Sequence, residues 1–106
     1  RRAAEALGVA GRLRIRPGLF REAIAGLPGD VRFALAHVDC NLYASTDDAC
    51  RFAVPRTAPG GAVVFDDYHG LRDLGARLAV DRFRAEHPLA IRRLCGSSAY
   101  AVIPGR

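Results

Sequence analysis

The sequence has 106 residues, half hydrophobic and a quarter charged, which suits one small globular domain and excludes a disordered chain. No apolar run approaches the roughly 18 residues needed to span a bilayer, so we expect no membrane partner. The net charge is +5, and all 16 basic residues are arginine. Because the arginines are dispersed and do not alternate with aromatic residues in a basic patch, we expect no nucleic-acid partner.

The amino-terminal third predicts short elements separated by glycine and proline. A helix end is expected over 2–7, a short strand over 13–15, and a helix over 20–27 that closes at a Pro-Gly-Asp turn. Residues 31–39 form a nearly unbroken apolar run between turn residues. This pattern is typical of a parallel strand that is covered on both faces.

The middle of the chain predicts a helix followed by a second buried strand. Ser45 or Thr46 is expected to cap a helix that runs to about residue 54, with Asp48 at the capping-box position. Residues 55–61 then return the chain, and the apolar segment 62–66 predicts the strand.

The carboxyl-terminal third predicts one long helix and a hairpin. The helical pattern over 71–86 sets three leucines (71, 74 and 78) on one stripe, with Ala79 and Phe83 beside it. Residues 91–94 and 99–103 are separated by Gly-Ser-Ser and predict an antiparallel hairpin. Strands that alternate with helices indicate an α/β fold with a mostly parallel sheet and a carboxyl-terminal antiparallel hairpin.

Three carboxylates follow the two buried strands. Asp39 ends the first strand, and Asp66 and Asp67 follow the second. Ligands bind beyond the carboxyl ends of such strands, and neighbouring strands lie about 4.8 Å apart, so these acids can converge. Two like charges about 5 Å apart repel by roughly 3 kcal/mol at an effective dielectric near 20. Protonation, pairing with arginine or a hard cation such as Mg²⁺ would relieve this, whereas acids solvated at loop entrances would need no relief.

Other polar residues have two interpretations each. His69 could act as a base on a substrate hydroxyl or be an ordinary loop histidine. His37 lies inside an apolar run, where a hydrogen-bonded core histidine is expected. Tyr43 and Tyr68 flank the acids and could line a substrate pocket or pack in the interior.

The three cysteines form no Cys-x-x-Cys pair, which favours free thiols in a reducing, cytoplasmic compartment.

Three ordered segments carry a family resemblance: HVDCNLYASTDDA (37–49), PRTAPGGAVVFDDYHG (55–70) and GARLAVDRF (75–83). Together they resemble the macrocin O-methyltransferase family, whose members use S-adenosylmethionine to methylate hydroxyls of sugars and other natural products. The resemblance implies a Rossmann-like class I methyltransferase fold. It also implies a cytoplasmic enzyme of antibiotic biosynthesis that takes a small-molecule hydroxyl substrate. The resemblance does not decide whether the enzyme is a homo-oligomer.

Site roles follow from the resemblance position by position. Asp39, Asp66 and Asp67 correspond to Mg²⁺ ligands, and Asp39 also corresponds to a catalytic base, with His69 as the alternative. Phe20 and Asp39 correspond to contacts of the cofactor. The chain departs from the family at Asn41, where many members have a second aspartate that Asn cannot replace as a base.

The resemblance implies that residues 1–106 are the carboxyl-terminal part of one methyltransferase domain whose glycine-rich cofactor loop is absent. In the family strand order, 3-2-1-4-5-7-6, the strand over 31–38 would then be an exposed apolar edge. We therefore expect the 106-residue piece to be inactive and poorly stable alone. A non-catalytic binding module, or a decayed methyltransferase remnant, is the alternative that Asn41 favours, and a phosphoryl-transfer enzyme with carboxylate-bound Mg²⁺ is a third.

Overall fold

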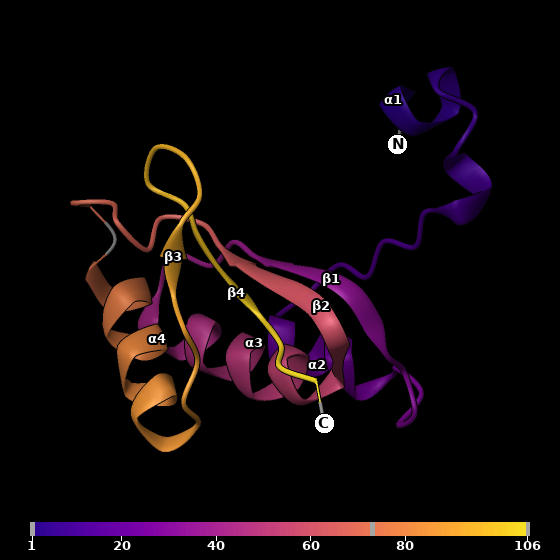
Figure 1. Ribbon diagram of the computed structural model, residues 1–106. Coiled ribbons are helices and arrows are strands. Elements are labelled where there is room, and N and C mark those ends of the chain that lie inside the picture. The colour runs from indigo at the N-terminus through magenta and orange to yellow at the C-terminus, as the bar shows by residue number, and fades with distance from the viewer. Residues whose placement is uncertain (1, 73, 106) are drawn as a thin grey trace.

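The computed structural model describes residues 2–72 and 74–105. These residues form five helical segments and four strands, and helices and strands alternate from α2 to β3 (Figure 1). In order they are α1 (Arg2–Ala6), η1 (Ala10–Arg12), α2 (Phe20–Ala25), β1 (Phe33–Val38), α3 (Tyr43–Arg56), β2 (Thr57–Phe65), α4 (Leu74–Glu86), β3 (Arg92–Arg93) and β4 (Ala99–Val102).

The four strands form one mixed sheet in the order β1-β2-β4-β3. β1 and β2 are parallel, while β4 is antiparallel to both β2 and β3. The α/β fold and the carboxyl-terminal hairpin are therefore confirmed. The order also matches the last four strands of the class I arrangement, 4-5-7-6, and it leaves β1 as an edge strand with Leu35 exposed, as expected.

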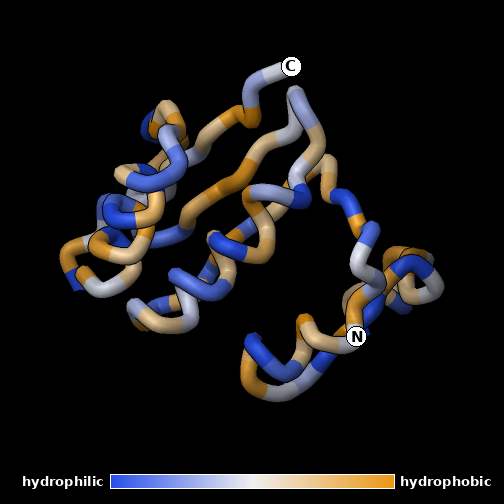
Figure 2. Tube along the Cα trace, turned by 90° about the horizontal axis from the view of Figure 1, so that it is seen from below, coloured by the Kyte–Doolittle hydropathy of each residue, from blue (hydrophilic) through white to orange (hydrophobic). Residues whose placement is uncertain are grey.

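The core lies between the sheet and the helices α3 and α4, which cover one face (Figure 1). Cys50 on α3, Phe83 on α4, and Val63 and Phe65 on β2 are almost completely buried there. Figure 2 looks from the helical side and shows hydrophobic stretches along the strands behind helices of mixed hydropathy. Burying each of the valine and phenylalanine side chains contributes about 1.5–3 kcal/mol.

The start of β2 approaches β1 so closely that one position requires glycine. A Cβ atom on Gly61 would lie 2.7 Å from the carbonyl oxygen of Ala34 and 2.9 Å from that of Ala58. The β1–β2 register also shifts here, since Phe33 pairs with Thr57 but Leu35 with Ala62. The missing side chain thus lets the two strands approach each other just before their regular pairing begins.

Three predictions about local structure are wrong. The strand expected over 13–15 does not form, because a strand needs a hydrogen-bonding neighbour and these residues have none in the described sheet. α3 begins at Tyr43, so neither Ser45 nor Thr46 is its cap; the Thr46 hydroxyl instead donates to the carbonyl of Cys40. β2 begins at Thr57, five residues before the predicted start.

The predicted leucine stripe, which begins before α4, faces solvent. Leu71, Leu74 and Leu78 are 90%, 57% and 62% exposed, whereas the buried face carries Ala76, Ala79, Val80 and Phe83. Small alanines let α4 approach α3 closely, which leucines at those positions would prevent. The periodicity therefore predicted the helix correctly, but the buried face is the one centred on Phe83.

The amino-terminal segment lies apart from the sheet and its helices in both ribbon and tube views (Figures 1 and 2). α1 and η1 have no buried residue, and Leu7 and Ile15 are largely exposed. Within the part of the chain that the structure describes, no helix has the length and apolar character needed to cross a membrane.

Candidate functional site

The parallel register brings the ends of β1 and β2 to the same level. Val38 pairs with Phe65, and the backbone nitrogen of Asp66 donates to the carbonyl of Val38 at 3.0 Å. Asp39 and Asp66 directly follow the ends of β1 and β2, so they lie side by side at the carboxyl edge of the sheet. The predicted convergence of acids from the two strands is confirmed for this pair.

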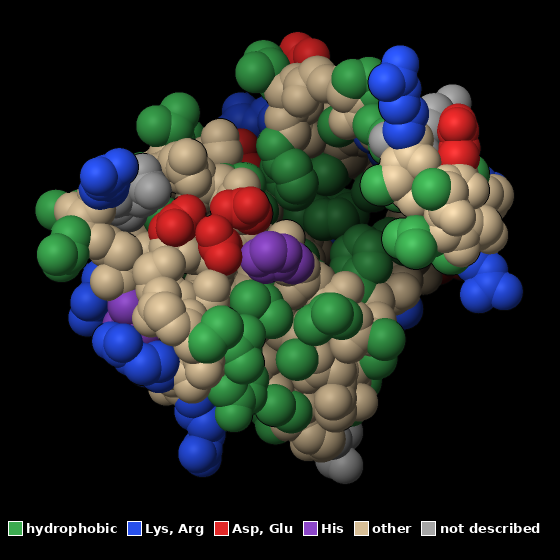
Figure 3. Space-filling view, turned by 90° about the horizontal axis from the view of Figure 1, so that it is seen from above, with side chains coloured by type: hydrophobic (Ala, Val, Ile, Leu, Met, Phe, Trp, Pro, Cys, Tyr) green, Lys and Arg blue, Asp and Glu red, His purple; other side chains and the backbone are tan. Residues whose placement is uncertain are grey.

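A histidine joins the two acids. One ligand atom from each of His37, Asp39 and Asp66 lies within 4.8 Å of the others, and Nε2 of His37 is 3.6 Å from Oδ1 of Asp66. Figure 3 shows acidic side chains gathered next to a histidine on this face of the molecule. The expectation of a core histidine is wrong, because the His37 side chain is 53% exposed at the carboxyl end of β1.

Asp66 is held by the hairpin as well as by the sheet. Oγ of Ser98, in the turn before β4, donates to Oδ1 of Asp66 at 3.0 Å. This hydrogen bond lowers the pKa of Asp66, partial desolvation opposes it, and Asp39 and His37 lower the pKa further. Sequence reasoning missed Ser98, since only the Gly-Ser-Ser turn signal marked it and nothing local linked it to a residue 32 positions away.

Asp67 occupies a sharp turn just after β2. Its φ is +58°, in the left-handed region, and its carbonyl accepts from the backbone nitrogen of Gly70 at 2.9 Å. Among the described residues, the ligand atoms that lie close together belong to His37, Asp39 and Asp66, and Asp67 is not in this group. A metal role for Asp67 thus stays a prediction from the family resemblance.

His69 is not part of this group of close ligand atoms among the described residues. Its backbone nitrogen donates to the carbonyl of Ser97, and its ring meets that of Tyr68 edge-on at 4.9 Å. Desolvation, then the charges of Arg93 and Arg77, lower the pKa of its imidazole. His69 is thus not brought together with His37, and its role as a base stays a prediction.

The two tyrosines pack against α4. The hydroxyl of Tyr68 donates to Asp81, and the Tyr43 hydroxyl accepts from Arg82 at 3.2 Å. Tyr68 is also almost fully buried, with Arg77 over its ring. These contacts favour the packing interpretation for Tyr68, while Tyr43 links α3 to α4 at the surface.

An apolar hollow of about 520 Å³ opens beside the cluster, next to the histidine in Figure 3. Its wall contains His37 and Asp39 together with three phenylalanines, and the ring of Phe52 contacts those of Phe20 and Phe33. Phe20 therefore lies where an apolar part of a ligand could pack. Its predicted contact with the cofactor is untested.

The donor set fits a divalent cation. Oxygen ligands at about 2.1 Å from an ion lie about 3.0 Å apart on adjacent positions and about 4.2 Å apart across it. The 3.6 Å between His37 and Asp66 falls within that range, and the 4.8 Å limit for the whole group exceeds it only slightly. Small side-chain rotations would bring the three atoms to one ion.

Fold and site together define a class I methyltransferase type of α/β domain, with a carboxylate and histidine cluster at the carboxyl edge of its sheet. Residues 5–93 match the family model described as Macrocin-O-methyltransferase (TylF), and the chain belongs to this family.

Two curated relatives and one solved structure illustrate the match. The chain is 43% identical over 56 residues (53% of this chain and 21% of the relative) to 8-demethyl-8-(2,3-dimethoxy-alpha-L-rhamnosyl)-tetracenomycin-C 4'-O-methyltransferase of Streptomyces olivaceus. It is 32% identical over 78 residues (74% and 29%) to Mycinamicin III 3''-O-methyltransferase of Micromonospora griseorubida. The O-methyltransferase NovP superposes with a TM-score of 0.85 at 25% identity, covering 98% of this chain and 43% of that one. The chain thus spans less than a third of the curated relatives' length.

Proposed function

We propose that the protein containing this chain is an S-adenosylmethionine-dependent O-methyltransferase that acts, with Mg²⁺, on a hydroxyl of a sugar or other natural product. The observation that carries the proposal is the convergence of Asp39 and Asp66 at the carboxyl ends of two parallel strands, beside an apolar hollow. Family membership supports the reaction class, and the names of the relatives support a glycosylated antibiotic as the substrate class.

Each acid has a distinct proposed task. Asp39 and Asp66, with Asp67 from the next turn, would hold Mg²⁺, and the ion would supply Lewis acidity to the substrate hydroxyl. Asp39 would also accept the proton of that hydroxyl at a carboxylate oxygen as the methyl group is transferred. The Ser98 hydroxyl fixes one oxygen of Asp66, so that carboxylate is oriented before any ligand arrives.

We propose that binding of the cofactor needs residues beyond this chain. Phe20 lines the hollow and could pack against the cofactor, but the relatives are several times longer than the matched region. We propose that the 106 residues alone do not support methyl transfer, and that the active protein resides in a reducing, cytoplasmic compartment. The absence of any disulfide among its three cysteines supports the second point.

Asn41 keeps the alternative of a non-catalytic binding module open to test. Its side chain follows the cluster on the exposed loop before α3, where many family members have an aspartate. If proton acceptance needs a carboxylate at this position, the protein would bind its ligands without turnover. Asn41→Asp should then raise methyl transfer, whereas an enzyme that uses Asp39 as its base should gain little.

The test is methyl transfer by the product of the complete reading frame, with mycinamicin III and a panel of glycosylated acceptors analysed by mass spectrometry. We expect transfer by the wild type, and a loss of about 100-fold or more in Asp39→Asn and Asp66→Asn, since each removes a charge that acts on the reacting group. Asp30→Asn is the matched control, because Asp30 is exposed in the turn before β1. Absence of both transfer and S-adenosylmethionine binding would refute the proposal.

A further inference from the structure

His37 is built into the carboxylate cluster by the geometry of β1. His37 is in β1 and Asp39 follows the strand directly, and their ligand atoms lie within 4.8 Å of each other. The parallel register sets His37 opposite Val64, two residues before Asp66, which follows the end of β2. The imidazole therefore reaches the carboxylate of Asp66 from the strand next to it, with Nε2 at 3.6 Å from Oδ1.

An imidazole changes which cation such a site favours. Carboxylate and water oxygens suit Mg²⁺, whereas imidazole nitrogen suits the transition ions, whose affinity rises along the series from Mn²⁺ to Cu²⁺. The His37 side chain is about half exposed, so it can turn toward an ion between the two acids without opening the core. Its exposure also leaves room for water at the remaining coordination positions.

We propose that His37 is a nitrogen ligand of the metal site and that it makes the site prefer Mn²⁺ or Co²⁺ over Mg²⁺. The inference rests on the proposed function, because it uses the same Asp39 and Asp66 carboxylates. It adds a ligand from β1 to the carboxylate set and predicts a mixed nitrogen and oxygen coordination sphere.

The competing arrangement is an ion pair without a metal. A protonated His37 at 3.6 Å from Asp66 would neutralise part of the acidic charge by itself. In that case the histidine competes with any cation, and its removal should strengthen metal binding. The two arrangements thus predict changes of opposite sign for the same substitution.

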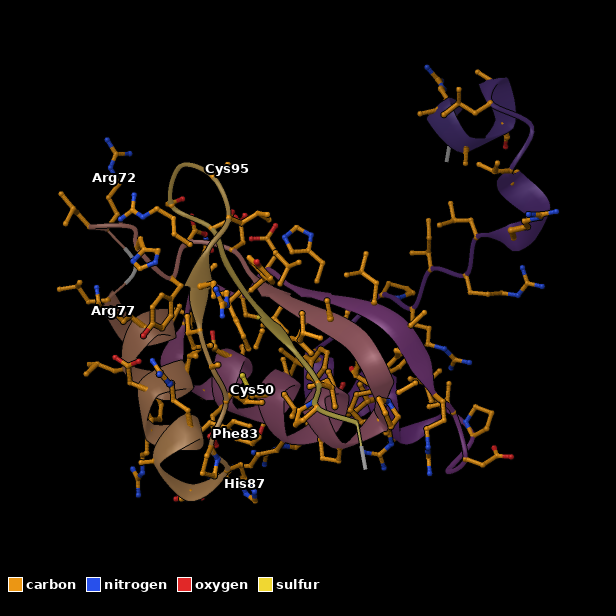
Figure 4. All side chains as sticks on the ribbon, viewed as in Figure 1. Cys50, Arg72, Arg77, Phe83, His87 and Cys95 are labelled. Carbon is orange, nitrogen blue, oxygen red and sulfur yellow. The ribbon has the colours of Figure 1, made fainter. Side chains whose placement is uncertain are left out.

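The experiment titrates Co²⁺ and Mg²⁺ by calorimetry into the product of the complete reading frame and into His37→Gln, Asp66→Asn and His87→Gln. His87 is the matched control, since it is exposed at the carboxyl end of α4 (Figure 4), where its ring stacks on Phe83. Pulsed electron paramagnetic resonance of the Mn²⁺ form adds a second readout, because a directly bound ¹⁴N nucleus modulates the spin echo.

We expect His37→Gln to weaken Co²⁺ binding by about tenfold or more, as loss of even a supporting residue of a metal site costs 10–100-fold. It should also abolish the ¹⁴N modulation and change Mg²⁺ affinity much less, while His87→Gln changes neither. Unchanged or tighter Co²⁺ binding in His37→Gln, with binding lost in Asp66→Asn, would overturn the inference alone. Binding that survives in Asp66→Asn would overturn the metal site of the proposed function as well.

Discussion

Gly61→Ala tests whether the close approach of β1 and β2 is as tight as the structure indicates. The new Cβ would meet two backbone oxygens, at 2.7 Å on Ala34 and 2.9 Å on Ala58, and the Thr57 side chain at 2.9 Å. Real Cβ contacts are essentially never shorter than 3.0 Å, so the backbone of one strand has to move. Because β1 carries Asp39 and β2 leads into Asp66, any such shift also disturbs the site.

The expected cost follows from two opposing effects. Overpacking a well-packed position costs about 1–3 kcal/mol. Replacing glycine by alanine restricts the unfolded chain, which offsets about 0.4–1 kcal/mol of that cost. The middle of each range leaves a net loss of about 1.3 kcal/mol in the free energy of unfolding. For a domain of this size this lowers Tm by roughly 5–10 °C.

Thermal and urea unfolding followed by circular dichroism measure this loss. Gly29→Ala is the matched control, because a Cβ on Gly29 meets nothing within 4 Å and its φ is not in the left-handed region. That variant should be as stable as the wild type or slightly more stable. If Gly61→Ala is equally stable, the close contact between the strands does not exist, and the argument for how β1 and β2 position the acids fails.

Three further predictions concern the site, the thiols and the core. The lowered pKa of Asp66 means that its carboxylate stabilises the fold above the unfolded value near 3.9, and that this contribution is lost as pH falls through the lower folded value. Ser98→Ala should therefore reduce the loss of stability below about pH 4 in urea titrations; an unchanged acid profile would contradict this. Iodoacetamide should alkylate Cys95 at the exposed hairpin end first (Figure 4), and Cys50 only on unfolding, because burial raises the pKa of Cys50 to about 12. Rapid labelling of Cys50 in the native state would refute its burial. Phe83→Ala should cost about 3–5 kcal/mol, against less than about 0.5 kcal/mol for truncating an exposed leucine of the same helix, as measured by urea unfolding.

Local sequence patterns predicted the elements with strong periodicity or clear turn signals. The apolar run before Asp39, the helical pattern that ends at Glu86 and the Gly-Ser-Ser turn all gave elements of the expected type. The strand predicted over 13–15 failed, because a strand exists only where another strand satisfies its backbone hydrogen-bonding groups. The capping prediction at Ser45 failed since the pattern does not show how far a helix extends before it.

The acids of the site could be identified from the sequence because each follows an apolar strand, and the ends of parallel strands meet at one edge of a sheet. Residue type alone could not reveal that His37 belongs with them. Its position in an apolar run indicated the core, and only the parallel register of β1 and β2 placed its ring beside Asp66.

The sequence by itself determined the α/β class, the order of the elements and the two strand ends that carry the chemistry, since these depend on periodicity and turn residues within a few positions. Only the tertiary structure decided which face of α4 is buried, that Ser98 reaches Asp66, and that a histidine completes the cluster. These features depend on which surfaces of the helices and strands pack together. Contacts between residues far apart in the chain cannot be predicted from the local sequence pattern.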